Sequence, residues 1–390
     1  MRGNPRLLVG LSALHFALFP IPVITLYWTE QIGMSLADVM TLQAAFSLTI
    51  VVCEFPSGYV ADRVGYRASL VIGGVAWVTG WLVYAWAGSF GSVLLAEAIL
   101  GVGLAFMSGA DRALLWVSLE ATGRAGEYTR WDGRMRAAGQ ISEAVTSAAG
   151  GWLYTIRQRL PFWLQIPVAT LGLASIIALE EEPRPKPTAH QSHLGRAWHI
   201  LRFTLWRGRR LRAAMALAVA LGLSSFVMVW LIQPYMRGRG IPPSWFGPLW
   251  AAAHLWLAAV SLASARVVAV LGVRATLFGC CLLVPLGYAG LAASPSAGGV
   301  VFYLAFMTLR GLQGPILGRV MQEEAPPEDR ASVLSLAALL FRLSFAIAGP
   351  PIGALVDRAG MDAALAVLGV VFTAASLAAL LVFTRAHARP

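Results

Sequence analysis

The chain has 390 residues, of which 58% are hydrophobic and only 13% are charged. Ordinary soluble domains contain roughly 45–50% apolar and about 25% charged residues, so this composition excludes a soluble globular protein and favours one that crosses a membrane many times. The net charge of +11 does not indicate a nucleic-acid partner, because the arginines lie in short clusters between apolar runs.

The apolar runs predict an all-α integral membrane protein with twelve transmembrane helices. A crossing takes roughly 20 residues, and a backbone in lipid must satisfy its own hydrogen bonds, which makes helices the default. In the first half the predicted helices cover residues 6–28, 36–60, 68–88, 92–118, 130–155 and 160–180. In the second half they cover residues 211–236, 244–270, 275–293, 297–322, 330–356 and 361–383.

The predicted helices divide the chain into an N-terminal six-helix bundle (1–182), a linker with an amphipathic segment (183–210) and a C-terminal six-helix bundle (211–390). With a cytoplasmic N-terminus, most arginines fall in alternate loops, the linker and the C-terminal tail. The positive-inside rule therefore predicts a multi-pass protein of the cytoplasmic membrane with both termini and the linker in the cytoplasm.

Two short internal repeats support duplicated halves. Residues 104–108 (LAFMS) recur as 304–308 (LAFMT), and residues 65–70 (GYRASL) recur as 272–277 (GVRATL). The two repeats occur in the same order and at corresponding helix positions. Pseudo-symmetric halves of this kind predict a transporter with its binding site where the repeats meet.

A charged turn follows the second predicted helix, and its pattern resembles the loop signature of the major facilitator superfamily. The matching residues are Gly58, Asp62, Arg63, Gly65 and Arg67. The resemblance covers essentially the whole chain. It implies the major facilitator fold, in which two six-helix bundles rock around a central cavity, and an exporter-like bacterial branch of the family.

The resemblance also implies a role for Asp62, which in the family packs against the positive N-terminal end of the eleventh helix and latches one conformation. A carboxylate beside a helix N-terminus is stabilised by roughly 0.3–1 kcal/mol when exposed. Alternatively, Asp62 and Arg67 only end the helix in polar solvent. Arg130 and Arg134, at the start of the fifth helix, either complete the latch or anchor the loop in the cytoplasm.

Two departures weaken the resemblance to the well-known drug antiporters. Many proton-coupled exporters carry an arginine four residues before a glycine in helix 4, and here Glu97 precedes Gly101. The antiporter motif of helix 5 is also degraded, because residues 146–151 read TSAAGG.

Ionisable residues inside the predicted helices are candidate proton or substrate groups, because a charge at mid-membrane costs at least roughly 2.5–3.5 kcal/mol. They are Glu54, Asp111, Arg112, Glu143, Arg310 and Arg342, and the uncharged polar residue Gln313 is a candidate with them. The acids lie in the first half and the isolated arginines in the second, which suggests a proton-handling half and an anion-binding half. Alternatively, Asp111 or Glu143 forms a static ion pair with Arg112, Arg310 or Arg342.

Two intramembrane histidines, His15 and His254, could titrate near neutral pH or could be packing residues. Nucleotide-binding and metalloprotease motifs do not occur in the sequence, so we expect no enzyme activity, cofactor or metal. The expected partners are a small-molecule substrate, protons and the lipid bilayer, and we expect a monomer.

The sequence thus predicts a secondary active transporter that exports drug-like or metabolite substrates in exchange for protons by alternating access. One alternative is uptake of an anionic metabolite, which Arg310 and Arg342 would favour. The other is a flippase for lipids or amphiphiles on the same fold.

Overall fold

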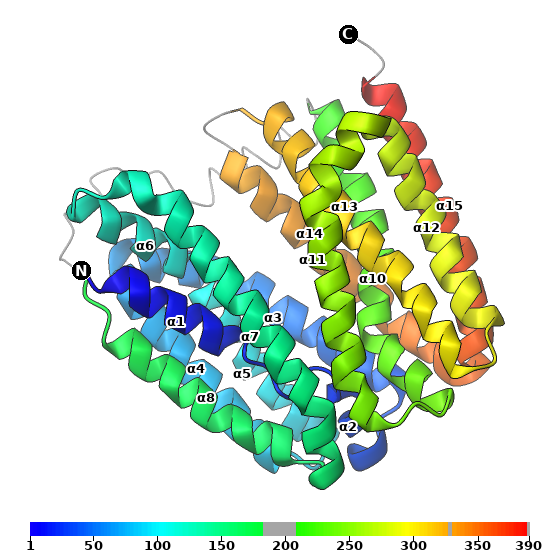
Figure 1. Cartoon of the computed structure of the whole chain (residues 1–390), viewed down its shortest axis with the longest axis horizontal. Helices are drawn as coiled ribbons and strands as arrows, with labels where there is room; N and C mark the ends of the chain where they lie inside the picture. The colour runs from blue at the N-terminus through cyan, green and yellow to red at the C-terminus, as the bar shows by residue number, and fades with distance from the viewer. Residues whose placement is uncertain (182–207, 327–329, 388–390) are drawn as a thin grey trace. The chain divides into compact units, whose positions relative to one another are not determined.

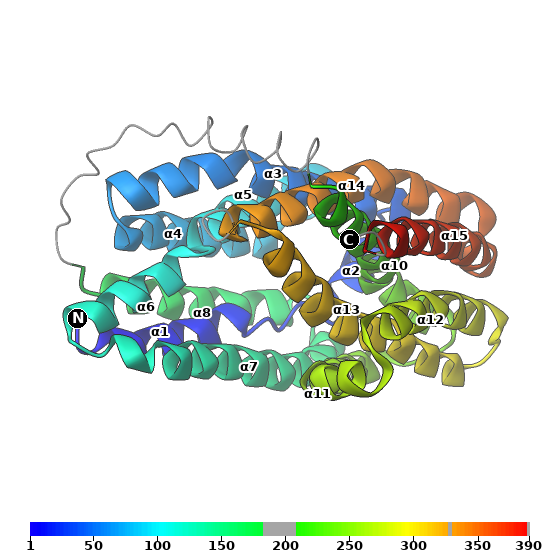
Figure 2. The ribbon, with the colours of Figure 1, turned by 90° about the horizontal axis from the view of Figure 1, so that it is seen from above.

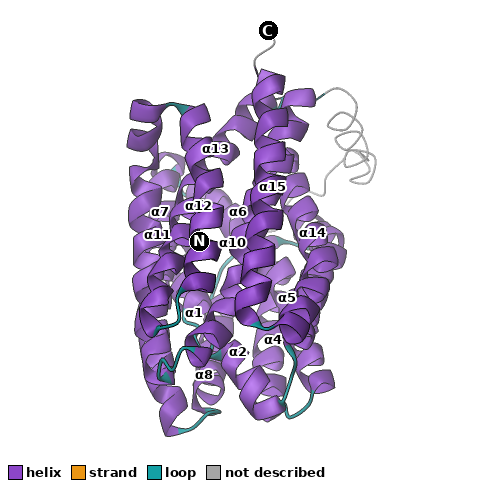
Figure 3. Cartoon of the chain, turned by 90° about the vertical axis from the view of Figure 1, so that its right-hand side faces the viewer, coloured by secondary structure: helices purple, strands orange, loops and turns teal. Residues whose placement is uncertain are grey.

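The computed structural model describes residues 1–181, 208–326 and 330–387, and every regular element in these ranges is helical (Figure 3). Within this part of the chain, ten helices are long and apolar enough to cross a membrane. Two further helical segments complete the predicted twelve: the first, which is broken, and α7, which carries five charged side chains in its first sixteen residues. The predicted linker lies outside the described residues up to residue 207.

The N-terminal half follows the predicted order of helices. Its elements are α1 (Asn4–Phe16), α2 (Ile24–Tyr27), the π-helical turn η1 (Trp28–Ile32), α3 (Leu36–Arg63), α4 (Tyr66–Trp86), α5 (Phe90–Met107), α6 (Ala110–Ala121), the 3-10 turn η2 (Ala125–Glu127), α7 (Tyr128–Ile156) and α8 (Leu160–Ile177).

The C-terminal half likewise gives six long helices. Its elements are α10 (Arg209–Gly238), the 3-10 turn η3 (Pro243–Trp245), α11 (Phe246–Leu271), α12 (Val273–Ala293), the 3-10 turn η4 (Ala297–Phe302), α13 (Tyr303–Glu324), α14 (Arg330–Ala359) and α15 (Met361–His387).

The first predicted helix, over 6–28, is interrupted in the structure. Helix α1 ends at Phe16, and the chain becomes helical again only at Ile24. Pro20 and Pro22 lie in the break; proline lacks a backbone N–H and disfavours helix in the residue before it. The buried Gln165 of α8 accepts a hydrogen bond from the Phe19 N–H (3.2 Å), so a neighbouring helix satisfies part of the exposed backbone.

The predicted fourth helix is also interrupted. It divides into α5 and α6 at Ser108 and Gly109. Gly109 has a φ of +82°, a conformation that a residue with a Cβ rarely adopts. Helix α6, which follows this break, carries Asp111 and Arg112.

The described residues form two compact units. The first contains residues 1–34, the described part of 41–189, and 242–251; the second contains 35–40, the described part of 190–241, and 252–390. In the first unit, α4 packs between α5 and α8, and α1 lies against α7 and α8 (Figure 1). In the second unit, α12 packs between α13 and α15, while α10 contacts α13, α14 and α15 (Figure 2).

Glycines allow close helix packing in both units. A Cβ on Gly73 of α4 would lie 3.0 Å from the carbonyl oxygen of Gly103 on α5, and one on Gly287 of α12 would lie 2.6 Å from the Phe306 ring on α13. Small residues at helix interfaces let backbones approach closely, which is a main source of association in a membrane.

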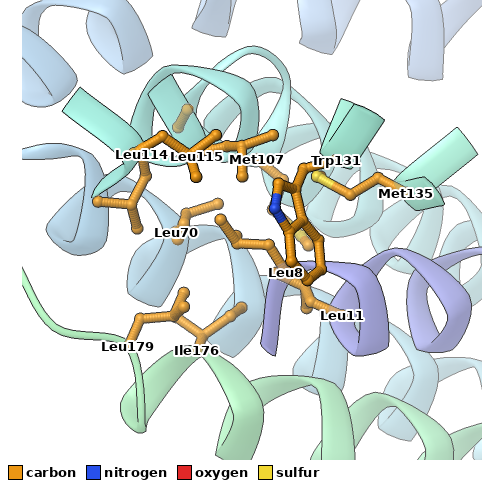
Figure 4. Close-up of a cluster of buried hydrophobic side chains, with 12 residues drawn as sticks. Leu8, Leu11, Leu70, Met107, Leu114, Leu115, Trp131, Met135, Ile176 and Leu179 are labelled. Carbon is orange, nitrogen blue, oxygen red and sulfur yellow. The ribbon is translucent and has the colours of Figure 1, made fainter. Parts of the chain in front are cut away.

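Part of the first unit's core is a cluster of buried apolar side chains (Figure 4). Leu8 of α1, Leu70 of α4 and Ile176 of α8 are fully buried in it, and the Trp131 side chain of α7 packs there with them. The cluster fixes the ends of α4 and α8 beside the loop that carries the charged turn.

The two ends of each half are joined by hydrogen bonds. In the first unit, Asn4 donates from Nδ2 to the carbonyl oxygen of Glu180 (2.6 Å), and the Met1 amino group pairs with the Glu180 carboxylate. In the second unit, Arg210 donates from Nε to the carbonyl oxygen of Ala386 (3.4 Å).

Candidate functional site

The charged turn between α3 and α4 is held by Glu181, which follows α8. The two carboxylate oxygens of Glu181 accept hydrogen bonds from the backbone N–H groups of Tyr66 (3.0 Å) and Arg67 (2.7 Å), the first residues of α4. A carboxylate at this end of a helix satisfies unpaired N–H groups and the helix dipole. Glu181 therefore caps α4 within the first unit.

Gly65 makes this cap possible. Its φ is +136°, and a Cβ at this position would lie 2.8 Å from Oε2 of Glu181. Arg67 adds a further bond, because its Nη2 donates to the carbonyl oxygen of Ile177, the last residue of α8 (2.7 Å). The motif residues Gly65 and Arg67 thus fasten α4 to α8.

The remaining motif residues lie at the end of α3. Asp62 and Arg63 are exposed, and the Arg63 guanidinium lies 5.9 Å from the ring centroid of Tyr59. Gly58 lies in the interior of α3, with open space where a Cβ would be. The latch role of Asp62 stays a prediction.

The start of α7 carries a cluster of charges around Trp131. Both Glu127 oxygens accept hydrogen bonds from Arg124 (2.9 and 2.8 Å), and one also accepts from Nε1 of Trp131 (3.1 Å). The hydrogen bonds from Arg124, with that from Trp131, lower the pKa of Glu127 from 4.5 to about 2. The guanidinium of Arg134 lies 4.7 Å from the Trp131 ring centroid, and Arg130 is exposed.

Asp132, which the sequence analysis did not single out, is the ion-pair partner of Arg112. The Nε of Arg112 lies 3.2 Å from Oδ1 of Asp132, and Arg136 donates to the other oxygen (2.8 Å). Asp111 instead accepts a hydrogen bond from the backbone N–H of Arg112 (2.7 Å). The Arg112–Asp132 pair therefore connects α6 to α7, and the Arg136–Asp132 pair spans one turn of α7. Asp111 is half-buried beside them.

The other two predicted acids differ in exposure. Glu54 is exposed on α3, and Glu143 is half-buried in the middle of α7. The three predicted acids, Glu54, Asp111 and Glu143, thus lie on α3, α6 and α7. Asp132 lies near the start of α7, away from Glu143 in its middle. The structure does not gather these four acids into one site.

Among the described residues, the most deeply buried carboxyl group is that of Glu97 on α5, which is 5% exposed. It accepts hydrogen bonds from the Tyr84 hydroxyl (2.7 Å) and from Nε2 of Gln43 (3.2 Å). Tyr84 and Gln43 are themselves buried, at 0% and 4% exposure. In the described part of the chain, both hydrogen-bond partners of Glu97 are uncharged side chains. Sequence reasoning noted Glu97 only as a departure from a family pattern.

In the second unit, a cavity of about 360 Å³ lies between α10, α13 and α14. Arg310 and Gln313 of α13 line it, together with Phe226 of α10 and Phe341 of α14. Arg342 is half-buried on α14 and does not line this cavity. Two of the four predicted site residues of this half, Arg310 and Gln313, therefore share one cavity.

The two histidines have different surroundings. The His15 ring lies 4.5 Å from the Trp77 ring centroid and 5.4 Å from that of Phe16, as in an aromatic packing site. His254 is half-buried on α11 and interacts electrostatically with Arg310. Within the second unit, His254 is therefore an electrostatic neighbour of one cavity residue.

The described residues contain no group of three or more histidine, cysteine, aspartate or glutamate side chains that could hold a metal ion. Helices long enough to span a membrane, with buried polar groups and a cavity between helices, are typical of membrane transport proteins.

Comparison with known proteins supports this class. The family described as the Major Facilitator Superfamily matches residues 7–349, and the chain belongs to this superfamily. It is a secondary transporter and not an enzyme.

Several solved structures share the fold at low sequence identity. The nucleoside transporter NupG matches with a TM-score of 0.82 and 14% identity over 98% of this chain and 99% of that one. A D-xylose-proton symporter matches with a TM-score of 0.75 and 15% identity over 97% of each chain.

A curated relative from Mycobacterium tuberculosis, the drug efflux pump JefA, is 26% identical over 207 residues. The match covers 51% of this chain and 40% of the relative, so the chain matches less than half of the relative's length.

Proposed function

We propose that the protein exports a small organic molecule across the cytoplasmic membrane in exchange for protons, by alternating access, and that Glu97 carries the proton. The burial of Glu97 beside Tyr84 and Gln43 is the observation that carries the proposal. A charged carboxylate inside a membrane span costs at least roughly 2.5–3.5 kcal/mol without a partner. The Tyr84 O–H and the Gln43 N–H would stabilise the carboxylate once its proton has left, and so permit both states in one transport cycle.

Export is supported by the similarity to a relative described as a drug efflux pump, which covers half of this chain. The arginine distribution supports cytoplasmic termini. In this orientation Glu97, seven residues after the start of α5, lies nearer the outer end of that helix. Protons from outside would therefore have the shorter distance along α5 to reach it.

Glu54, Asp111 and Glu143 are further proton-carrying candidates in the proposal, but burial ranks Glu97 first. Glu54 is exposed and the other two are half-buried. Asp62 keeps the latch role that the family resemblance implies, with Arg130 and Arg134 as its possible partners.

The test uses purified full-length protein in liposomes that contain a pH-sensitive dye, with candidate substrates added outside. We expect Glu97→Gln to abolish substrate-driven proton movement while substrate binding persists, because the amide cannot carry a proton. Glu120→Gln, at an exposed acid near the end of α6, is the matched control and should behave as wild type. Full proton movement in the Glu97→Gln variant would refute the proposed role of Glu97.

Uptake of an organic anion together with a proton is the second candidate, and the Arg310 cavity favours it. Net charge movement separates the two functions. Exchange of one proton for one monoanion moves two charges per cycle, whereas joint uptake of the same two ions moves none.

A further inference from the structure

We propose that the cavity between α10, α13 and α14 binds organic monoanions that carry a flat apolar group, and that Arg310 holds the anionic end. The inference rests on the proposed function in one respect, since it names the class of molecule that the transporter would carry. It is argued from the charge, walls and size of the cavity.

Arg310 provides a positive charge without a matching negative one. The side chain is half-buried, and among the described residues it forms no hydrogen bond or ion pair with a carboxylate. Its electrostatic neighbours are His254 and Tyr303, neither of which is negatively charged at neutral pH. A guanidinium inside a span is costly unless it meets an anion or water. The anion that completes this site is therefore expected to come from a ligand.

Gln313 adds a polar group beside this charge. It lies three residues after Arg310 and thus on the same face of α13. Its Oε1 is buried and has no hydrogen-bond partner among the described residues. Its Nε2 can donate to an anion while Arg310 offers a planar fork of N–H donors, which fits carboxylates and sulfonates.

The opposite walls of the cavity are apolar. The rings of Phe226 and Phe341 meet edge to face, with centroids 5.3 Å apart and planes at 76°. Gly222 leaves room for Phe341, because a Cβ there would lie 3.1 Å from its ring. Three alanines and a valine add further apolar lining: Ala218, Val219, Ala337 and Ala338. Ser225 also lines the cavity, but its hydroxyl is engaged with backbone carbonyl oxygens of its own helix. Flat aromatic groups pack well on such ring faces and edges.

The size and charge of the cavity narrow the ligand class. A volume of about 360 Å³ is at the lower end of ordinary ligand sites, roughly 300–1,000 Å³, and suits one or two fused rings. Arg310 would repel a cationic group, so lipophilic cations are excluded by charge. Aromatic carboxylates and sulfonates remain as the matching class.

The test measures binding of three molecules of nearly the same shape to the purified full-length protein by isothermal titration calorimetry: 2-naphthoate, its amide and 2-naphthylmethylammonium. We expect only the anion to bind measurably. Arg310→Gln should weaken naphthoate binding by about 10- to 100-fold, the range expected for lost charged hydrogen bonds. Arg266→Gln, at an exposed arginine of α11 that does not line the cavity, should leave it unchanged.

Two further variants keep the test decisive if Arg310→Gln fails to fold. Arg310→Lys keeps the charge without the planar fork and should bind with intermediate affinity, while Phe341→Ala should weaken naphthoate binding and leave the preference for the anion. Equal binding of naphthoate and its amide, or wild-type affinity in folded Arg310→Gln, would overturn the inference.

The result of this binding test can be distinguished from the result of the transport test for the proposed function. Naphthoate binding that depends on Arg310, without any proton movement, would uphold the site and refute proton exchange. Proton-coupled transport of other substrates, with no anion binding that depends on Arg310, would uphold proton exchange and refute the anion site.

Discussion

Arg67 and Arg274 make the same hydrogen bond in the two halves of the protein. Arg67, the second residue of α4, donates from Nη2 to the carbonyl oxygen of Ile177 at the end of α8 (2.7 Å). Arg274, the second residue of α12, donates from Nη2 to the carbonyl oxygen of His387 at the end of α15 (3.3 Å). The repeat at residues 65–70 and 272–277 is therefore matched by a repeated contact.

This parallel predicts similar effects of Arg67→Lys and Arg274→Lys on stability. Lysine keeps the charge but loses the guanidinium geometry, and each exposed bond contributes roughly 0.5–1.5 kcal/mol. We expect each variant to lower the free energy of unfolding by about 1 kcal/mol or less. The double variant should show the sum, because the two bonds share no residue. Thermal unfolding of the purified variants would measure this, and strong non-additivity would contradict independent contacts.

Two glycines of the same motif should respond in opposite ways to alanine. Gly65→Ala places a Cβ at positive φ and 2.8 Å from the Glu181 carboxylate, so we expect a loss of about 1–3 kcal/mol. Gly58→Ala, in the interior of α3 with open space around it, should be neutral or gain up to about 1 kcal/mol. Unfolding midpoints of the two variants provide the comparison. Equal destabilisation by the two substitutions would contradict the strain expected at Gly65.

The cluster at Glu127 predicts a pH dependence. Because hydrogen bonds from Arg124 lower the pKa of Glu127 from 4.5 to about 2, its contribution to stability is complete above about pH 4.5 and is lost as the pH falls towards 2. We expect Glu127→Gln to lower the unfolding midpoint at pH 7 and 5, with the difference from wild type shrinking at pH 3. Arg124→Gln should lack the same pH-dependent stabilisation. A difference in unfolding midpoint from wild type that stays constant at all pH values would argue against the Arg124–Glu127 pair.

Charge movement gives a prediction that depends on both proposals. If one proton enters for each organic monoanion exported, two elementary charges move per cycle, and each is worth roughly 2.3 kcal/mol per 100 mV of membrane potential. We expect an inside-negative potential imposed with potassium and valinomycin to accelerate export from liposomes. Transport that is indifferent to the potential would instead favour joint uptake of proton and anion.

The long apolar runs of the sequence predicted the helices well, because hydrophobicity and length decide a membrane span. Breaks were harder to predict. Pro20 and Pro22 disfavour a helix near the end of the first span, but the helix already ends at Phe16, before either proline. Gly109 carried no sequence signal that distinguishes it from the other helical glycines.

The candidate site depended more on contacts that sequence does not reveal. Arg310 and Gln313 were predicted because a polar pair in an apolar span is conspicuous. Glu97 was not, because its environment comes from Tyr84 and Gln43, which lie 13 and 54 residues away along the chain. The capping residue Glu181 lies 114 residues from Arg67 along the chain, just beyond the last predicted helix of the first half, and no local pattern connects the two.

The hydrogen bonds between the ends of each half bear on how the chain can be made. Asn4 meets Glu180 in one half and Arg210 meets Ala386 in the other, so each bundle closes on its own first and last helices. A chain cut between residues 182 and 207 would keep both closures. The two bundles could thus be produced as separate polypeptides and recombined, which would let an isotope label or a substitution be placed in one half alone.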